Sequence, residues 1–185
     1  MDAVVSAAWL AAHREEVRVA DVRDAWEYDG IGHLPGAVNV PFDAFRGDEG
    51  EAGKLPGADR FAGLMSEAGV SEDDRIVAYD DTHGVFAARL LVTAELYGHD
   101  RAKLALLDGD FSAWQREFTT EQGPVDVEPA EYTAAFDTEG PLIPMAEVKR
   151  AIEASATLVD TREAWEYEEG HIPGAIRLDW RELVD

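Results

Sequence analysis

Short apolar runs along the chain alternate with segments whose apolar residues recur at helical spacing. The apolar runs, bounded by turn residues, predict strands over residues 17–22, 37–40, 76–79 and 104–107. Helices are predicted over residues 59–68, 85–97 and 111–118. In the first of these, Phe61, Leu64 and Met65 share one face and Gly69 follows as the C-cap. Ser6 is placed to cap an earlier helix.

This alternation predicts an α/β fold. Strands that alternate with helices form parallel βαβ units with right-handed crossovers, which gives an open parallel sheet with helices on both faces. We expect this sheet from about residue 4 to about residue 120. Residues 42–57, rich in glycine and acids, are expected to form a surface connection. The predicted core consists of Val19, Val22, Val40, Val77, Ala78, Leu106 and Leu107.

One pattern occurs twice, over residues 19–38 and 159–176, with a single inserted residue in the first copy. Each copy has a strand ending in Asp-x-Arg, an acidic segment with Trp-Glu-Tyr, and a Gly-His-(Leu/Ile)-Pro-Gly-Ala turn before a second apolar run. The paired residues are Asp21 and Asp160, Arg23 and Arg162, Trp26 and Trp165, Glu27 and Glu166, Tyr28 and Tyr167, and His33 and His171. The chain therefore contains an internal duplication. A histidine before a turn is more often a hydrogen-bonding anchor than a catalyst, and we interpret His33 and His171 in that way.

The duplication divides the chain. The first copy extends over residues 1–120, and residues 121–141, with three prolines and two glycines, are expected to be a linker. Residues 142–185 form the first part of the second copy, with a helix over residues 144–153. The second copy is expected to be incomplete, because it stops before its equivalents of the 59–68 helix and the 76–79 strand. An incomplete copy leaves apolar residues that need a cover from the first domain, from another chain by self-association, or from residues beyond 185. These apolar residues are Val159, Ile176, Leu178 and Trp180.

The charge of the chain is strongly negative. The formal net charge is -23, and the carboxylates are spread along the sequence. Such a spread on an ordinary apolar content is typical of halophilic proteins, in which salt screens the repulsion. We favour that interpretation over a binding surface for a basic partner. Nucleic-acid binding is disfavoured because no basic patch is visible.

The composition restricts location and chemistry further. No signal peptide is expected at the N-terminus, and no apolar run approaches the roughly 18 residues of a membrane span. We therefore expect a cytoplasmic protein with no membrane partner. The sequence contains no cysteine, which excludes disulfides and cysteine-ligated metal within it. No cofactor and no metal site is expected.

Chemistry is expected where the 76–79 strand ends. Ligands of open parallel sheets bind at the carboxyl ends of strands. There the chain reads Asp80, Asp81, Thr82, His83 and Gly84, and it then enters the 85–97 helix. A loop with inward N–H groups before a helix N-terminus attracts an anion.

Together, the duplicated motif and this loop resemble a rhodanese (sulfurtransferase) domain, and the tandem arrangement resembles the two-domain thiosulfate and 3-mercaptopyruvate sulfurtransferases. In such enzymes the first loop residue is a cysteine, whose thiolate attacks the sulfane sulfur of a donor and carries it as a persulfide. Asp80 stands at that position here. The resemblance implies that the N-terminal domain carries such a substitution and that the C-terminal domain holds the cysteine. Asp80 is then a cap or a loop-ordering carboxylate, or it keeps a residual binding role.

Arg162 matches the arginine that lines the substrate pocket of the active domain in the family. Its guanidinium is suited to hold an anionic donor bidentately. The structural alternative is that Arg162 pairs with Asp160 or Glu166 and stabilises the motif. The equivalent pairing in the first copy applies at least as well to Arg23.

The resemblance implies a sulfurtransferase of the thiosulfate:cyanide type, with a small anionic sulfur donor and a thiophilic acceptor as partners. The persulfide is expected on a part of the second domain beyond residue 185, so that the chain as given is inactive. The alternative is a non-catalytic rhodanese-like module for binding or regulation. A phosphatase of the related fold is disfavoured, because it also needs a loop cysteine. The choice between thiosulfate and 3-mercaptopyruvate as donor stays open.

Overall fold

The computed structural model describes residues 1–47 and 54–183, which form two compact units with the boundary after Thr138. The expected surface connection over residues 42–57 falls partly on residues outside the described ranges. Within its described part, the ring of Phe45 is fully buried.

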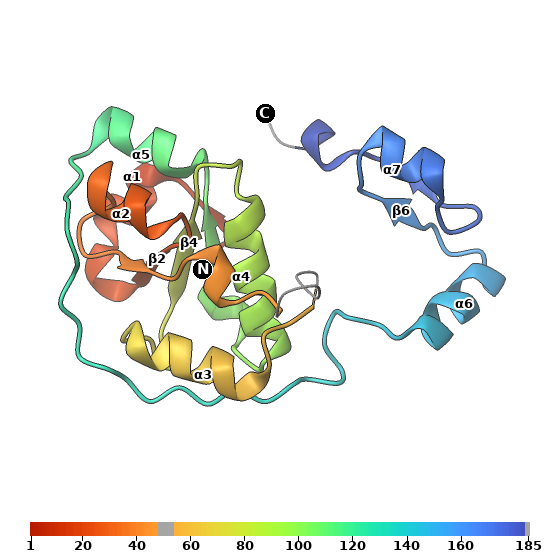
Figure 1. Cartoon of the computed structure of the whole chain (residues 1–185), viewed down its shortest axis with the longest axis horizontal. Helices are drawn as coiled ribbons and strands as arrows, with labels where there is room; N and C mark the ends of the chain where they lie inside the picture. Colours follow the sequence, from red (N-terminus) through yellow and green to blue (C-terminus); the bar gives the residue numbers. More distant parts are fainter. Residues whose placement is uncertain (48–53, 184–185) are drawn as a thin grey trace. The chain divides into compact units, whose positions relative to one another are not determined.

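The first unit is built on a parallel sheet (Figure 1). Its strands are β1 (Val4–Val5), β2 (Arg18–Asp21), β3 (Val38–Asn39), β4 (Ile76–Tyr79) and β5 (Leu104–Leu107). Their order in the sheet is β1-β5-β4-β2-β3, and every pair is parallel. The helices are α1 (Ala7–Ala12), α2 (Ala25–Gly30), α3 (Ala58–Glu67), α4 (Val85–Leu96) and α5 (Asp110–Glu117), with short 3-10 turns at Arg14–Glu16, Phe42–Ala44 and Arg101–Lys103. The predicted α/β fold with its parallel sheet is confirmed.

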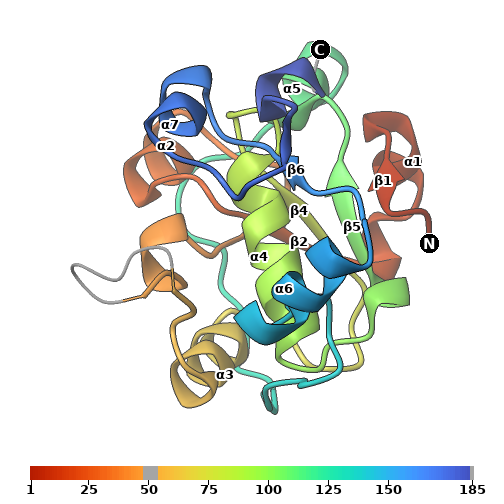
Figure 2. The same ribbon diagram turned by 90° about the vertical axis from the view of Figure 1, so that its right-hand side faces the viewer.

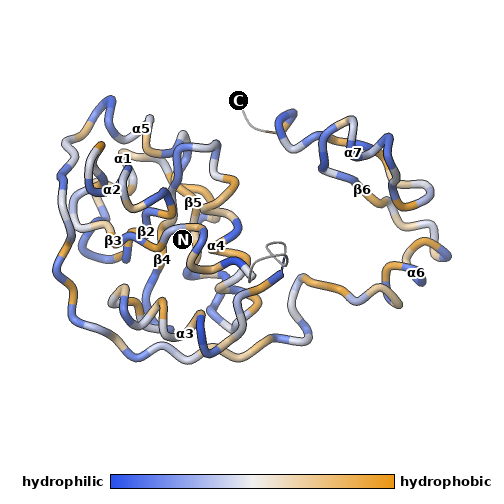
Figure 3. The backbone as a smooth tube through the Cα atoms, viewed as in Figure 1, coloured by the Kyte–Doolittle hydropathy of each residue, from blue (hydrophilic) through white to orange (hydrophobic). Residues whose placement is uncertain are grey.

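Helices cover both faces of this sheet. Residues of α3 and α4 pack with Ile76 and Ala78 of β4, whereas residues of α1 and α5 pack with Val77 and Tyr79. Alternate residues of a strand point to opposite faces, so one central strand contributes to two apolar layers. Figure 2 shows α1 and α3 on opposite sides of the sheet, and Figure 3 shows β5 as one of the most apolar stretches of the chain.

The predicted core is correct at all but one of its positions. Val19, Val22, Val40, Val77, Ala78 and Leu107 are buried. Leu106 is only half-buried. It lies on β5 beside the two-residue edge strand β1, where its side chain lines an open groove between β1 and α4. The prediction failed there because sequence periodicity does not reveal that a neighbouring strand is too short to close the layer.

Much of the segment expected as a linker packs on the first unit. Ala130 N donates to Ser66 O (3.0 Å), and Ala135 N donates to Tyr97 O (3.1 Å). Tyr132 is 6% exposed and meets the ring of Phe61 edge-on at 5.9 Å. The compact unit therefore continues to Thr138.

The second unit repeats the local structure of the first copy. It contains α6 (Met145–Glu153), β6 (Val159–Asp160), α7 (Ala164–Glu169), β7 (Ile176–Arg177) and a 3-10 turn at Trp180–Glu182. β6 pairs with β7 in parallel, with Asp160 opposite Arg177, as Asp21 lies opposite Asn39 in the first copy. Val159 and Ile176 are 48% and 56% exposed. Among the helices in the described ranges, none combines the length and apolar character needed to cross a membrane.

Candidate functional site

Asp80 lies at the carboxyl end of β4 and is fully buried. Its Oδ1 accepts hydrogen bonds from the N–H groups of Thr82 (2.8 Å) and Gly84 (2.8 Å). Its Oδ2 accepts from Phe86 (2.8 Å) and Ala87 (3.0 Å), in the first turn of α4. The carboxylate of Asp80 thus occupies the cradle that the loop and the helix N-terminus form together.

The loop backbone is shaped to form this cradle. His83 and Gly84 both have positive φ, at 57° and 79°, which lets the N–H groups of Thr82 and Gly84 point toward Asp80. A Cβ at Gly84 would lie 2.8 Å from the end of the Leu106 side chain, so both conformation and space favour glycine there. Asp81 and His83 are exposed, Thr82 is half-buried and Gly84 is buried. Of the loop residues singled out in the sequence, Asp80 alone places its carboxylate in the cradle.

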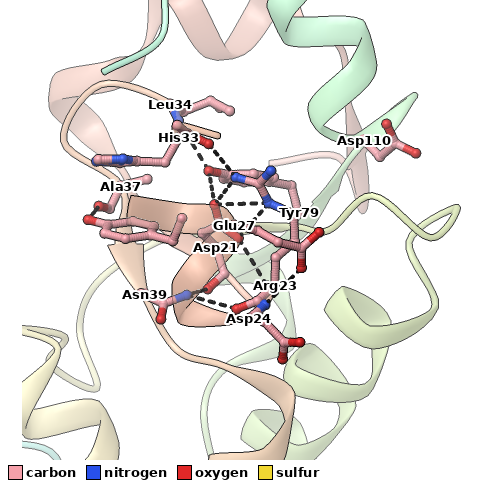
Figure 4. Close-up of polar contacts among 12 residues, drawn as sticks. Asp21, Arg23, Asp24, Glu27, His33, Leu34, Ala37, Asn39, Tyr79 and Asp110 are labelled. Atoms are coloured by element: carbon pink, nitrogen blue, oxygen red, sulfur yellow. Dashed lines mark hydrogen bonds and ion pairs between the residues drawn. The ribbon is translucent and has the colours of Figure 1, made fainter. Parts of the chain in front are cut away.

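A second buried cluster lies beside the loop and joins Asp21, Arg23 and Tyr79 (Figure 4). Arg23 donates to both carboxylate oxygens of Asp21, with Nη2 at 2.6 Å and Nε at 3.0 Å, and also to the carbonyl of Gly32 (2.7 Å). The hydroxyl of Tyr79 donates to Asp21 and accepts from Leu34 N. These are charge-assisted bonds, and they fix the end of β2 against the motif turn.

Burial and charge act together on this cluster. Burial favours a lower pKa for Arg23, but the hydrogen bond and charge of Asp21 outweigh it and raise the pKa. Burial and the adjacent Asp21 raise the pKa of Tyr79 well above its ordinary value. The guanidinium carbon of Arg23 also lies 3.8 Å from the centre of the Phe111 ring. Arg23 therefore stays charged and enclosed, and it is not free to hold a solute.

In the second copy the equivalent arginine–aspartate pair is exposed to solvent. Arg162 Nη2 lies 2.7 Å from Asp160 Oδ2, and it donates to the carbonyl of Gly170 at 2.8 Å. The hydrogen bonds from Arg162 lower the pKa of Asp160 to about 2. The Arg162 side chain is 45% exposed, against 1% for Arg23. In the described residues no counterpart of Tyr79 or Phe111 covers Arg162, and its unused donors face solvent.

The two motif histidines differ. His171 is exposed, stacks on Tyr167 at 3.7 Å, and its Nδ1 lies 2.8 Å from the Tyr167 carbonyl. His33 is fully buried and stacks on Tyr28 at 3.8 Å, but neither of its ring nitrogens has a hydrogen-bond partner. The expected anchoring bond is therefore made by the ring of His171 and not by that of His33.

Sequence reasoning missed two buried residues, Tyr79 and Phe111, and the exposed Glu121, whose carboxylate accepts from Gly36 N in the motif turn (2.6 Å). Tyr79 was recognised as the end of a strand, but the bonding of its hydroxyl depends on a contact 58 positions away in sequence. No local signal marks Phe111 as a cover for Arg23, or Glu121 as a partner of the motif turn. In the described part of the chain, no group of three or more His, Asp or Glu side chains is arranged to hold a metal ion.

Comparison with known proteins matches the chain to the rhodanese-like domain family over residues 6–117 and 144–184. It is 31% identical to the 3-mercaptopyruvate sulfurtransferase of Escherichia coli (strain K12), over 97% of this chain and 72% of that protein. It is 32% identical to the thiosulfate sulfurtransferase of Corynebacterium glutamicum, over 98% of this chain and 66% of that protein. The crystal structure of SseA from Escherichia coli, a 3-mercaptopyruvate sulfotransferase with the rhodanese fold, superposes with a TM-score of 0.86 at 31% identity. That superposition covers all of this chain and 78% of SseA.

Proposed function

The chain belongs to the rhodanese-like family, and on that premise we propose that it serves sulfur transfer of the thiosulfate:cyanide type. The relatives that support this are named as thiosulfate or 3-mercaptopyruvate sulfurtransferases. The observation that carries the proposal is the contrast between the two copies. One guanidinium is enclosed beside a loop already filled by a carboxylate, and the other is exposed beside the same motif.

The sulfur-carrying group must be a thiolate. It attacks the sulfane sulfur of the donor, the bond within the donor breaks, and the leaving group takes the bonding electron pair. The thiophilic acceptor then takes the sulfur and the thiolate is restored. Asp80 cannot form a persulfide, and the 185 residues contain no cysteine. The nucleophile of the proposed reaction is therefore a cysteine outside this sequence, at the second domain's equivalent of Asp80.

Arg162 is the residue to which we assign donor binding. Its pair with Asp160 uses Nε and Nη2 on one side, so the guanidinium is fixed in orientation and keeps its charge. Thiosulfate and 3-mercaptopyruvate are both anions, and both are suited to a guanidinium. The loop that carries the cysteine determines which of these two donors the enzyme uses.

Two assays test this function. The pure 185-residue chain, supplied with thiosulfate and cyanide, should form no thiocyanate above the uncatalysed rate. A polypeptide that continues the second copy through a cysteine-bearing loop should form it, and Arg162→Ala in that polypeptide should raise the KM for the donor. Arg150→Ala is the control, because Arg150 is an exposed arginine of the same unit that pairs only with Glu147 in the described structure. Thiocyanate formation by the short chain, or equal kinetics for both variants, would contradict the assignment.

We further propose that the acidic surface adapts the protein to high salt, supported by a charge of -23 that is spread along the chain. We also propose that the exposed apolar residues of β6 and β7 drive self-association of the isolated 185-residue chain. The cytoplasmic location expected from the sequence stays a prediction, which cell fractionation would test.

A further inference from the structure

The inserted residue of the first copy changes the environment of its histidine. Arg23 bonds the carbonyl of Gly32 as Arg162 bonds that of Gly170, so the Gly-His pairs occupy equivalent places. The insertion therefore lies between Tyr28 and Gly32. In the second copy the histidine follows Tyr167 by four positions and reaches its carbonyl. In the first copy the spacing is five, and that bond is not made.

The chain that follows α5 covers the His33 ring. His33 N donates to Glu121 O (2.9 Å), and Glu121 N donates back to His33 O (3.0 Å). The Glu121 carboxylate accepts from Gly36 N at 2.6 Å, and its Oε1 lies 3.6 Å from His33 Nε2. Gln122 donates to the carbonyl of Gly30 (2.8 Å). Gly32 permits this approach, since a Cβ there would lie 2.9 Å from Glu121 O.

We propose that His33 and Glu121 form a pH-sensitive clasp, which holds residues 119–123 on the motif turn while His33 is neutral and releases them when His33 is protonated. The closed clasp encloses an imidazole with both nitrogens unpartnered. An imidazolium in that place has the Glu121 carboxylate as an ion-pair partner at 3.6 Å, but neither of its N–H groups has an acceptor within hydrogen-bond distance, and the ring is fully buried. When residues 119–123 move away from the motif turn, water reaches the His33 ring.

Charges from three elements act on His33. Asp21 on β2, Asp29 on α2 and Glu121 favour its protonated form, whereas Arg23 disfavours it. Burial is the largest effect, and the net result lowers the pKa of His33. Tyr28 stacks on the ring without charge.

The direction in which pH changes the stability of the clasp follows from the lowered pKa of His33. The open segment has an ordinary histidine pKa of about 6.5. The clasp is thus fully stable above that pH and weakens as the pH falls toward the lower pKa of the closed state. Within that window the ratio of open to closed forms rises about tenfold for each pH unit.

Hydrogen exchange by NMR at constant high salt tests the clasp. The amides of His33 and Glu121 report its opening, and those of Val77 and Ala78 in β4 report global unfolding. We expect the protection factors of the first pair to fall about tenfold per pH unit below about pH 6.5 and to stay below those of β4 at every pH, which places the opening in residues 119–123 and not in the whole unit. Protection factors correct for the pH dependence of the intrinsic exchange rates.

Two variants isolate the histidine. His33→Phe keeps a ring against Tyr28 and should abolish the pH dependence, whereas His171→Gln, in the exposed copy of the motif, should leave it unchanged. Equal pH dependence in His33→Phe and in the unmodified chain would overturn the clasp, and so would flat protection in the unmodified chain. If His33→Phe fails to fold, the titration of the His33 imidazole decides instead: an apparent pKa at or above the ordinary histidine value of about 6.5 overturns it.

Discussion

Replacing Asp80 by alanine should destabilise the first unit far more than the same replacement of Asp81 in the same loop. The substitution removes the acceptor of four backbone N–H groups at once. Those of Gly84 and Ala87 are buried, and those of Thr82 and Phe86 are partly open to water. A buried donor left without a partner costs about 1–3 kcal/mol. The two buried donors alone therefore predict a loss of about 2–6 kcal/mol in the free energy of unfolding.

Urea unfolding at a fixed, high KCl concentration measures this loss, because typical domains have only about 5–15 kcal/mol in total. Asp81→Ala is the matched control. It removes the same charge from the same loop, but Asp81 is exposed. Its carboxylate accepts a 3.3 Å bond from the Thr82 hydroxyl and interacts with the Glu27 carboxylate. Its effect should stay within about 0.5 kcal/mol. Asp80→Asn should lie between the two, because its amide keeps one acceptor oxygen and turns an NH₂ toward the donors.

The two alanine variants decide the matter together. If Asp80→Ala unfolds at the same urea concentration as Asp81→Ala, the four hydrogen bonds contribute no net stability, and Asp80 does not order the loop. A large loss in the free energy of unfolding of both variants would show that the negative charge of the loop, and not the four hydrogen bonds of the cradle, stabilises the unit.

Tyr79→Phe should cost about 1–3 kcal/mol in urea unfolding, because it leaves Leu34 N without its acceptor and removes one of the donors to Asp21. An unchanged midpoint would show that water replaces the hydroxyl. Thermal melts across a KCl series should show a rising Tm, since the screening length falls from roughly 30 Å at ~0.01 M to ~3 Å at ~1 M. A flat or falling Tm would count against salt adaptation. Sedimentation of the 185-residue chain should reveal association, and a clean monomer that binds no hydrophobic dye would contradict the expected role of Val159 and Ile176.

The sequence predicted those parts of the fold that local pattern determines. The short apolar runs around Val19 and Val77 became central strands, and the repeated motif became the same strand–helix–strand unit in both copies. Asp80 was identified from its place after a buried strand and before a helix. The hydrogen bonds of its carboxylate are all with residues 82–87, which is why a local reading was sufficient to find it.

What could not be predicted depends on contacts between distant parts of the chain. The difference between Arg23 and Arg162 arises because Tyr79 and Phe111 cover one and not the other, although the Asp-x-Arg motif is common to both. The docking of residues 121–137 was hidden by their prolines and glycines, although Tyr132 supplied an apolar ring that a flexible linker does not need.

The carboxylate of Asp80 can also be viewed as a ligand tethered to its own receptor. A free anion would occupy the same cradle only in proportion to its concentration, whereas a covalently attached group is present at an effective concentration that dilution does not change. An acidic protein in strong salt meets chloride at concentrations that compete for any loose cluster of N–H donors. Because the loop carries the anion itself, two residues before the first donor, we expect its conformation to depend less on salt than that of a loop that binds a free anion.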